Sequence, residues 1–351
     1  MGRMSSPLLF HGNFIFSIKG DPIVKAIQLH QTGSFEQLKY EEVDTPAADK
    51  NQVLIKVTSA SVNFADVMTR KGTYPMMPPL PAIPGIDCSG IVESVGAKVT
   101  RFRPGQPVAA IGRGCYADYM VSSPAAVFPI SGDIDMDEAA AIPVNYLTAY
   151  HMLHTMAQAG KGRTVLAYAA AGGVGTAVIQ LAKLAGVKVI GLTSSEAKAE
   201  FARSQGYDHI INYQTEDVVG RVKDITGGKG VEVILNSAAG DTFSRDFKML
   251  APLGQIIWFG MAAGPPQGNL AEQLGAKFVR SAGIRTFMLP SIFELDPALM
   301  ARSAGILFKD LADKKIKPHI HERLPLSEAA RAHELLESGK VRGKLILKPG
   351  S

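Results

Sequence analysis

The part of the sequence most suggestive of chemistry is a cluster of small residues, LAYAAAGGVG at 166–175. It approximates the G-x-G-x-x-G pattern of dinucleotide-binding turns, with Ala170, Gly172 and Gly175 at the three glycine positions. Gly172 would let the backbone approach a diphosphate, and the N–H groups at the start of the following helix favour a phosphate. We therefore predict a phosphate-binding turn made by Ala171, Gly172, Gly173, Val174 and Gly175. The alternative is a tight strand-to-helix corner without a ligand.

The end of the next predicted strand indicates which dinucleotide this turn would bind. Enzymes that use NAD place Asp or Glu about 20 residues after the turn, where the carboxylate bonds the ribose 2′-OH. Here Thr193 stands at that position, so a 2′-phosphate would meet no carboxylate. Ser194 and Ser195 can donate hydrogen bonds, and Lys198 brings a positive charge one turn later. We therefore expect the cofactor to be NADPH.

Tyr213 ends the following predicted strand on the same rim and can add a further hydrogen-bond donor. The alternative interpretation is that Lys198 belongs to an exposed helix face and that Glu196 bonds the ribose of NAD. A preference for NADH in a turnover assay would support that alternative.

The hydrophobic pattern after Thr148 predicts the scaffold for these residues, a parallel and doubly wound α/β sheet. Strands are expected at 164–169, 187–192, 209–213, 231–238 and 255–260. Helices are expected after the first strand and at 215–226, 242–250, 296–313 and 327–339, and a closing strand is expected at 344–349. Before Ile130, short apolar runs with frequent Gly and Pro predict an all-β, barrel-like lobe. Its strands are expected at 53–62, 89–96, 107–112 and 116–123.

Composition limits the classes of function. The chain has 351 residues and only two cysteines, Cys88 and Cys115, which excludes a disulfide framework and a four-cysteine zinc module. The net charge of +5 is scattered, so we expect no nucleic-acid partner. No apolar run is long enough to span a membrane, and we expect a cytoplasmic protein.

The first 22 residues are expected to be an N-terminal extension. Their apolar stretch PLLFHGNFIFSI is interrupted by His11 and Asn13, and no small-residue cleavage site follows. We expect the folded enzyme to begin at Val24.

The sequence resembles the zinc-independent quinone oxidoreductases (the zeta-crystallin-like family) of the medium-chain dehydrogenase/reductase superfamily. The resemblance runs from about residue 24 to 348. It rests on motifs in the family's order: SVNFADVMTRKGTYP, PGIDCSGIVESVG, IPVNYLTAYHML, LAYAAAGGVG, SSEAK, INY and WFG. In this family alanine commonly stands where this chain has Ala170.

The resemblance implies a GroES-like β-barrel catalytic domain joined to a Rossmann domain that binds NADPH. The implied domains are the extension at 1–22, the catalytic domain at 23–145, the Rossmann domain at 146–286, and a segment at 287–351 that returns to the catalytic domain. The family also implies a homodimer.

Departures from zinc-dependent relatives imply a metal-free enzyme. Those relatives carry Cys where this chain has Asn63, and Gly-His-Glu where it has Gly85, Ile86 and Asp87. Catalytic zinc needs three side-chain ligands such as Cys and His. Without a Lewis acid, alcohol oxidation is disfavoured, and reduction of a good hydride acceptor remains.

The resemblance supplies candidate catalytic residues in the first lobe. Asn63 would lie near the nicotinamide, Tyr74 would line the substrate side, and Asp66 matches a family position near the site. Tyr74 could donate a proton to the reduced substrate. Alternatively, Asn63 caps a turn and Tyr74 only walls an apolar pocket.

The remaining cofactor contacts are carried over from the family. They are Asn63, Thr148, Asn236, Phe259, Gly260, Phe287 and Lys344. A surface lysine is the alternative for Lys344.

We therefore expect an NADPH-dependent, metal-free reductase that transfers hydride to a quinone. One alternative is an enone, alkenal or enoyl reductase on the same scaffold. The other is a non-enzymatic NADPH-binding protein of the crystallin kind.

Overall fold

The structure, a computed structural model, describes residues 23–131 and 133–350. The extension predicted at 1–22 lies outside the described residues. The chain folds into two compact units. Unit 1 comprises 23–131, 324–333 and 347–350, and unit 2 comprises 133–323 and 334–346. The domain boundaries expected from the sequence remain predictions.

Unit 2 is built on a six-stranded parallel sheet. Its strands are β8 (Thr164–Ala167), β9 (Lys188–Thr193), β10 (His209–Asn212), β11 (Val231–Asn236), β12 (Leu250–Trp258) and β13 (Gly283–Thr286). They lie in the order β10-β9-β8-β11-β12-β13, and every neighbouring pair is parallel. The chain runs outward from β8 on one side and then returns to begin the other side at β11. Dinucleotides bind at the carboxyl edge beside such a reversal.

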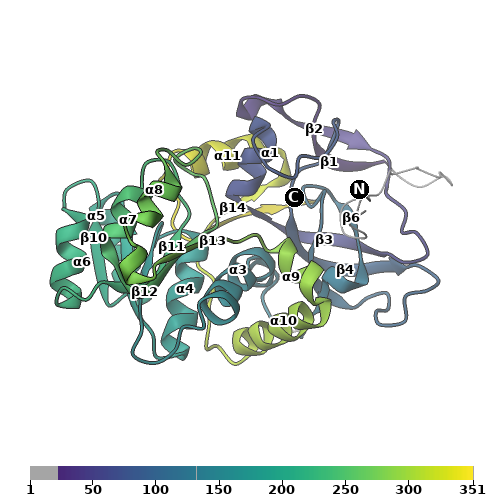
Figure 1. The fold of residues 1–351 in the computed structure, drawn as a ribbon. Helices are drawn as coiled ribbons and strands as arrows, with labels where there is room; N and C mark the ends of the chain where they lie inside the picture. Colours follow the sequence, from purple (N-terminus) through teal and green to yellow (C-terminus); the bar gives the residue numbers. More distant parts are fainter. Residues whose placement is uncertain (1–22, 132, 351) are drawn as a thin grey trace, which may run out of the picture. The chain divides into compact units, whose positions relative to one another are not determined.

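Helices connect these strands and cover the sheet. They are α4 (Gly173–Leu184), α5 (Glu196–Gln205), α6 (Val218–Thr226), α7 (Phe243–Met249) and α8 (Leu270–Gly275). Figure 1 shows α5, α6 and α7 grouped around β10, β11 and β12. The sequence sets both ends of α5: Ser195 Oγ accepts a hydrogen bond from the backbone N–H of Lys198, and Gly206 ends the helix in a left-handed conformation. Because Ser195 caps the helix, α5 begins at Glu196, three residues after the last residue of β9.

The central strands are buried on both faces, which explains their unbroken apolar sequences. The side chains of Ile190, Leu192, Ile234 and Ile256 are fully buried. Such runs are typical of parallel strands covered by helices on both sides. Burying each of these side chains stabilises the fold by about 1.5–3 kcal/mol. The sheet is therefore a firm support for the loops at its edge.

Unit 2 also contains helical segments whose form the sequence did not predict. They are α2 (Met136–Ala140), a π-helical segment at Ile142–Tyr146, α3 (Leu147–Tyr150) and a second π-helical segment at His151–Met156. After β13 come α9 (Pro290–Leu295) and the predicted long helix, α10 (Pro297–Ala312). π-Helical turns are rare and frequently lie at functional sites.

Unit 1 contains the antiparallel strands predicted for the first lobe. β1 (Val24–Leu29) pairs with β2 (Leu38–Val43). The other strands that lie wholly in unit 1 are β3 (Val53–Val62), β4 (Asp87–Val95), β5 (Pro107–Ile111), β6 (Tyr119–Ser122) and β7 (Val127–Pro129). Two later strands, β14 (Ile320–Pro325) and β15 (Lys344–Lys348), each begin in unit 2 and end in unit 1. Within unit 1, β3, β4, β5 and β7 are neighbours in that order, and β6 pairs with β3.

Few helices accompany the antiparallel strands. They are α1 (Phe64–Lys71) and α11 (Ala329–Glu337), the second of which begins in unit 1 and confirms the helix predicted near the end of the chain. Short 3₁₀ turns lie at Phe35–Gln37, Pro124–Ala126, Phe278–Arg280 and Leu326–Glu328. Within the described residues, no helix combines the length and the apolar character needed to cross a membrane.

Candidate functional site

The glycine-rich turn connects β8 to α4 at the carboxyl edge of the sheet in unit 2. A Cβ atom on Gly175 would lie 2.5 Å from Ala169 O and 2.6 Å from Ala170 O, so only glycine lets α4 start this close to β8. The N–H of Gly172 bonds Ala169 O at 2.8 Å, and Ala169 has a positive φ of 49°. The turn is therefore held by its own backbone.

The first turn of α4 leaves its N–H groups open. Gly172 is the N-cap and has no side chain with which to bond them. Helix N-termini carry unsatisfied donors and a partial positive charge of roughly half a unit. The predicted residues Ala171, Gly173 and Val174 belong to this turn, whose geometry fits a phosphate.

The end of β9 holds an unusual polar atom. Thr193 is 2% exposed, and its Oγ1 has no hydrogen-bond partner within the described residues. Its carbonyl accepts a bond of 3.0 Å from the N–H of Tyr213, whose side chain is 40% exposed. Strands β9 and β10 thus bring the two predicted residues to one rim. A buried hydroxyl without a partner costs about 1–3 kcal/mol, which a bound ligand could recover.

Lys198 stands on the first turn of α5, next to this rim. Its Nζ lies 3.5 Å from Ser194 Oγ, and partial burial lowers the pKa of the ammonium. Ser195, by contrast, uses its Oγ to cap α5. Glu196, the carboxylate that would indicate NAD, bonds Arg203 at 2.6 Å further along α5. This pairing disfavours the interpretation in which Glu196 bonds a ribose.

The end of β11 is organised differently, because every hydrogen-bonding position of the Asn236 amide is used. Its Oδ1 accepts from the N–H groups of Ala238 and Ala239, at 2.8 and 2.9 Å. Its Nδ2 donates to Thr242 Oγ1 at 2.8 Å and to Asp246 Oδ2 at 2.6 Å. The side chain is fully buried. Asn236 therefore shapes the loop after β11, and its amide has no capacity left for a ligand.

Asp246 anchors this network to the start of the glycine-rich turn. Its Oδ1 accepts a bond of 2.5 Å from the hydroxyl of Tyr168, to which Arg245 also donates at 3.0 Å. Burial raises the pKa of Asp246 to about 6, against the two hydrogen bonds, which lower it. The network ties the strand that leads into the turn to the end of β11.

The remaining predicted residues of the sheet edge lie after β12 and β13. The N–H of Phe259 bonds Asn236 O at 2.9 Å, and the N–H of Phe287 bonds Trp258 O at 2.9 Å. A Cβ on Gly260 would lie 2.7 Å from Ser237 O. Phe287 is 5% exposed. These residues follow β12 and β13 at the carboxyl edge of the sheet, and the bonds that hold them are mainly made by the backbone.

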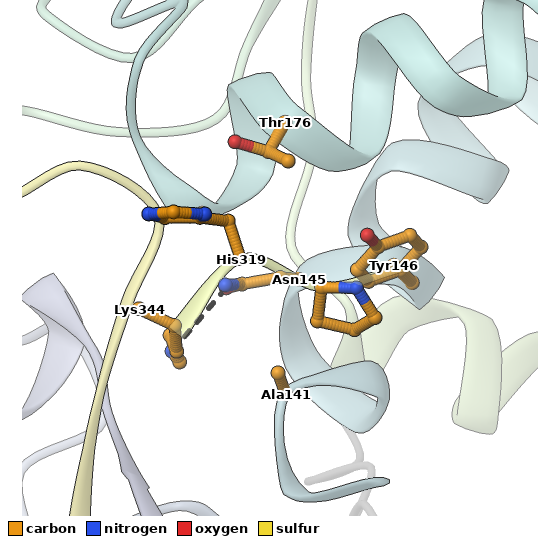
Figure 2. A pocket seen from close by; sticks show the side chains of 9 residues that line it. Ala141, Asn145, Tyr146, Thr176, His319 and Lys344 are labelled. Atoms are coloured by element: carbon orange, nitrogen blue, oxygen red, sulfur yellow. Dashed lines mark hydrogen bonds between the residues drawn. The ribbon is translucent and has the colours of Figure 1, made fainter. Parts of the chain in front are cut away.

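Lys344 and one residue missed by the sequence analysis meet beside the glycine-rich turn. Figure 2 shows Asn145 and Lys344 pointing toward one another, with Lys344 Nζ 3.5 Å from Asn145 Oδ1. They line a pocket with Gly173 and Thr176, and it has room for about one water molecule. Lys344 is 4% exposed, which excludes the surface lysine considered from the sequence. Asn145 lies within the family motif IPVNYLTAY, but no spacing rule distinguishes it from its neighbours there.

Thr148 lies on α3, two residues after the end of the π-helical segment Ile142–Tyr146. Its side chain is 8% exposed, and α3 packs against α4. Its expected contact with the cofactor stays a prediction.

In unit 1, the candidate residues Asn63 and Asp66 sit in a buried hydrogen-bond network. Asn63 Nδ2 donates to Asp87 Oδ1 at 2.7 Å, and Asp66 Oδ2 accepts from the backbone N–H of Asn63 at 2.8 Å as α1 begins. Asp66 Oδ2 also accepts from the Tyr116 hydroxyl at 3.1 Å. Asp66 is 1% exposed. The contacts of Asp66 make it a support for α1, and those of Asn63 fix its amide.

Tyr74 is half-buried in unit 1. Burial and the nearby Asp66 charge raise the pKa of its hydroxyl, while Arg113 acts in the opposite direction. Arg113 itself donates to Met76 O at 3.1 Å. Tyr74 therefore keeps its proton at neutral pH and can act as a hydrogen-bond donor.

Two of the positions where zinc-dependent relatives carry ligands hold a hydrogen-bonded pair, Asn63 and Asp87. Ser61 Oγ donates to the same Asp87 oxygen at 2.7 Å. Among the described residues, no three His, Cys, Asp or Glu side chains gather as a metal site would require.

Comparisons with known proteins identify the family. Residues 49–132 match the alcohol dehydrogenase GroES-like domain, and residues 173–300 match the zinc-binding dehydrogenase family. The quinone oxidoreductase of Rattus norvegicus is 34% identical over 332 residues, which cover 93% of this chain and 98% of that protein. The chain belongs to the quinone oxidoreductase family.

Other members and neighbours of this medium-chain dehydrogenase/reductase superfamily agree with the fold. The Escherichia coli quinone oxidoreductase, solved in complex with NADPH, superposes with a TM-score of 0.87 at 31% identity, over 93% of this chain and all of that one. A highly reducing polyketide synthase of Didymella fabae is 33% identical over 345 residues, 93% of this chain but 18% of that protein. The expected combination of a GroES-like domain with a Rossmann-type parallel sheet is confirmed. The family model named for zinc matches a region that contains neither Asn63 nor Asp87.

Proposed function

We propose that this member of the quinone oxidoreductase family reduces a quinone with NADPH as hydride donor. The observation that carries the choice of cofactor is the end of β9, where Thr193 replaces a carboxylate and Lys198 stands nearby. The solved E. coli relative with NADPH supports the same choice. NADPH, when bound, supplies the hydride, and the protein supplies binding and orientation.

The residues of unit 2 fit the two charged parts of NADPH. The turn from Ala171 to Gly175 and the open N-terminus of α4 would hold the diphosphate. Thr193 Oγ1, Ser194, Lys198 and the hydroxyl of Tyr213 would surround the 2′-phosphate, and an ammonium next to a phosphate gives a strong, charge-assisted bond. Ser195 contributes to this group mainly by capping α5.

The residues of unit 1 would serve the reduction step. Hydride transfer to a quinone or an activated C=C bond leaves negative charge on oxygen, which a fixed donor stabilises. Tyr74, protonated at neutral pH, is the proposed donor to that oxygen. The Asn63 amide, oriented by Asp87, is the proposed contact to the nicotinamide, and Asp66 is the positioning residue beneath it. This scheme needs no metal ion.

Reduction of an activated C=C bond is the second candidate. The polyketide synthase relative matches 93% of this chain, so the scaffold also occurs within enzymes with other names. A non-enzymatic NADPH-binding protein is the alternative of a different class, and it would bind NADPH without reducing any acceptor.

The test is NADPH oxidation against a panel of benzoquinones, naphthoquinones, phenanthrenequinone, alkyl enones, enals and an enoyl thioester. We expect turnover of at least one quinone with kcat/KM at least tenfold above every enone and thioester. Turnover only of an enone, enal or enoyl thioester would assign the enzyme to the second candidate. Tight NADPH binding without turnover of any acceptor would contradict both enzymatic functions.

We also propose a homodimer in the cytoplasm. Phe278 and Val279 are 85% and 92% exposed and follow α8, near the edge strand β13, and Leu253 on β12 is 77% exposed. Contiguous exposed apolar surface marks interaction sites, and Phe278 and Val279 are adjacent in the chain. Light scattering after size-exclusion chromatography should give a molar mass twice that of one chain. In the Phe278→Glu variant the measured mass should fall toward that of a single chain. A monomeric wild type would contradict the dimer.

A further inference from the structure

Asn145 occupies an unusual place for a buried amide. It lies in the π-helical segment Ile142–Tyr146 and is 5% exposed. Its Oδ1 accepts from Lys344 Nζ at 3.5 Å, and its Nδ2 lies beside Gly173 at the start of the following helix. Because Asn145 lines the pocket beside the glycine-rich turn, the two N–H groups of its Nδ2 can donate to a ligand there.

The Asn145 amide faces the beginning of α4. A Cβ atom on Gly173, the first residue of α4, would collide with Asn145 Nδ2 and lie 3.1 Å from its Cγ. Glycine is therefore required at position 173 because a side chain there would overlap the Asn145 amide, and not because of its backbone conformation. The missing side chain makes room for the amide, and Figure 2 shows the amide in the same pocket as Lys344 and Thr176.

The position of Lys344 relative to this turn is fixed by the backbone. The N–H of Gly343 bonds Ala171 O at 2.8 Å, and the N–H of Lys344 bonds His319 O at 2.9 Å. The chain before Lys344 is thus attached directly to the glycine-rich turn. Consequently one neutral donor, one cation and the open N–H groups of α4 lie together in unit 2.

We propose that Asn145 is a further diphosphate-binding residue. Its Oδ1 holds the Lys344 ammonium, and its Nδ2 donates to a diphosphate oxygen at the N-terminus of α4. The inference rests on the proposed function, because NADPH is the ligand that brings the diphosphate. Asn145 then adds a side-chain donor to a turn otherwise made of backbone groups.

The test compares two ligands in titration calorimetry with the full-length protein. NADPH carries both the diphosphate and the 2′-phosphate, whereas adenosine 2′-monophosphate carries only the latter. Asn145→Asp keeps the oxygen that faces Lys344 and removes the Nδ2 donor. We expect NADPH to bind about tenfold or more weakly to Asn145→Asp and several-fold more weakly to Asn145→Ala. Adenosine 2′-monophosphate should bind both variants within twofold of wild type.

Gly173→Ala tests the same contact without changing the amide. We expect it to weaken NADPH binding about tenfold by displacing Asn145, and to cost little more when added to Asn145→Ala. Gly305→Ala is the matched control, because Gly305 lies on α10 with open space where its Cβ would be. It should leave NADPH binding unchanged.

Two results would overturn the inference. One is NADPH affinity within twofold of wild type for Asn145→Asp and Asn145→Ala. The other is an equal loss of affinity for NADPH and for adenosine 2′-monophosphate, which would make Asn145 a general support of the fold. Failure of the cofactor choice on which the inference rests is distinguishable, since the wild-type protein would then bind NADPH weakly or not at all, and failure to reduce any quinone would show in the acceptor panel while NADPH still binds.

Discussion

The two halves of the parallel sheet end in different ways. On the β10-β9-β8 side, Thr193 Oγ1 has no partner within the described residues, and Lys198 and Tyr213 are only partly buried. On the β11-β12-β13 side, Asn236 uses all four of its hydrogen-bonding positions inside the protein. The difference shows that polar residues at one edge of a sheet can have two roles: some are left able to bind a ligand, and others bond within the protein and hold the loops in place. We interpret the first half as a ligand site and the second as its support.

The largest effect should come from breaking the supporting half. Asp246→Ala would leave the Tyr168 hydroxyl and one Asn236 N–H without their buried acceptor. We expect the free energy of unfolding in urea to fall by about 3 kcal/mol. Ser244→Ala on the same helix, where Ser244 is exposed, is the matched control and should change it by less than about 0.5 kcal/mol. A loss for Asp246→Ala as small as the control's would show that the network does not support the fold.

The next largest effect should come from the ligand half. Lys198→Ala removes the proposed cation beside the 2′-phosphate, so we expect NADPH to bind about 30-fold more weakly, or about 2 kcal/mol. Binding of NADH should stay within twofold, because NADH has no 2′-phosphate. Lys223→Ala on α6 is the control for loss of an exposed lysine, and NADPH affinity should not change. Equal losses for the two dinucleotides would place Lys198 outside the 2′-phosphate site.

Thr193→Val sharpens the comparison further, because it separates ligand binding from stability. The substitution removes a buried hydroxyl that lacks a partner, so the ligand-free protein should become more stable by about 1 kcal/mol. NADPH should bind several-fold more weakly at the same time. Thermal unfolding with and without NADPH measures both effects. Destabilisation of the ligand-free protein would mean that the hydroxyl already has a structural role.

The smallest effect is a pH dependence. Burial lowers the pKa of Lys198, so its ammonium loses its proton at a lower pH than an ordinary lysine. Binding of the 2′-phosphate needs the protonated form, and the KM for NADPH should therefore rise a few-fold as the pH increases through that lowered pKa. Lys198→Ala should show a flatter profile. A KM for NADPH that stays constant up to pH 10 would contradict this role.

The local part of this account was predictable from the sequence. The strand–turn–helix arrangement of β8 and α4 follows from apolar runs and from glycines within one short stretch, and the family model and relatives confirm the fold. Thr193 and Lys198 were found because their distance from the turn along the chain is fixed by one helix and one strand.

The long-range part was not predictable in the same way. Asn145 and Lys344 are separated by 199 residues, and the bond that attaches Gly343 to Ala171 also joins segments that are far apart in the sequence. The saturation of Asn236 depends on where α7 places Asp246. No pattern within a window of the sequence specifies such partners, because they depend on how the elements pack.

The central claim is that the open half of the sheet edge recognises the 2′-phosphate. Titration calorimetry of the wild-type protein with NADPH and with NADH, under identical buffer and salt, tests it most directly. The account predicts that NADPH binds at least tenfold more tightly than NADH. Equal affinities, or tighter binding of NADH, would contradict it.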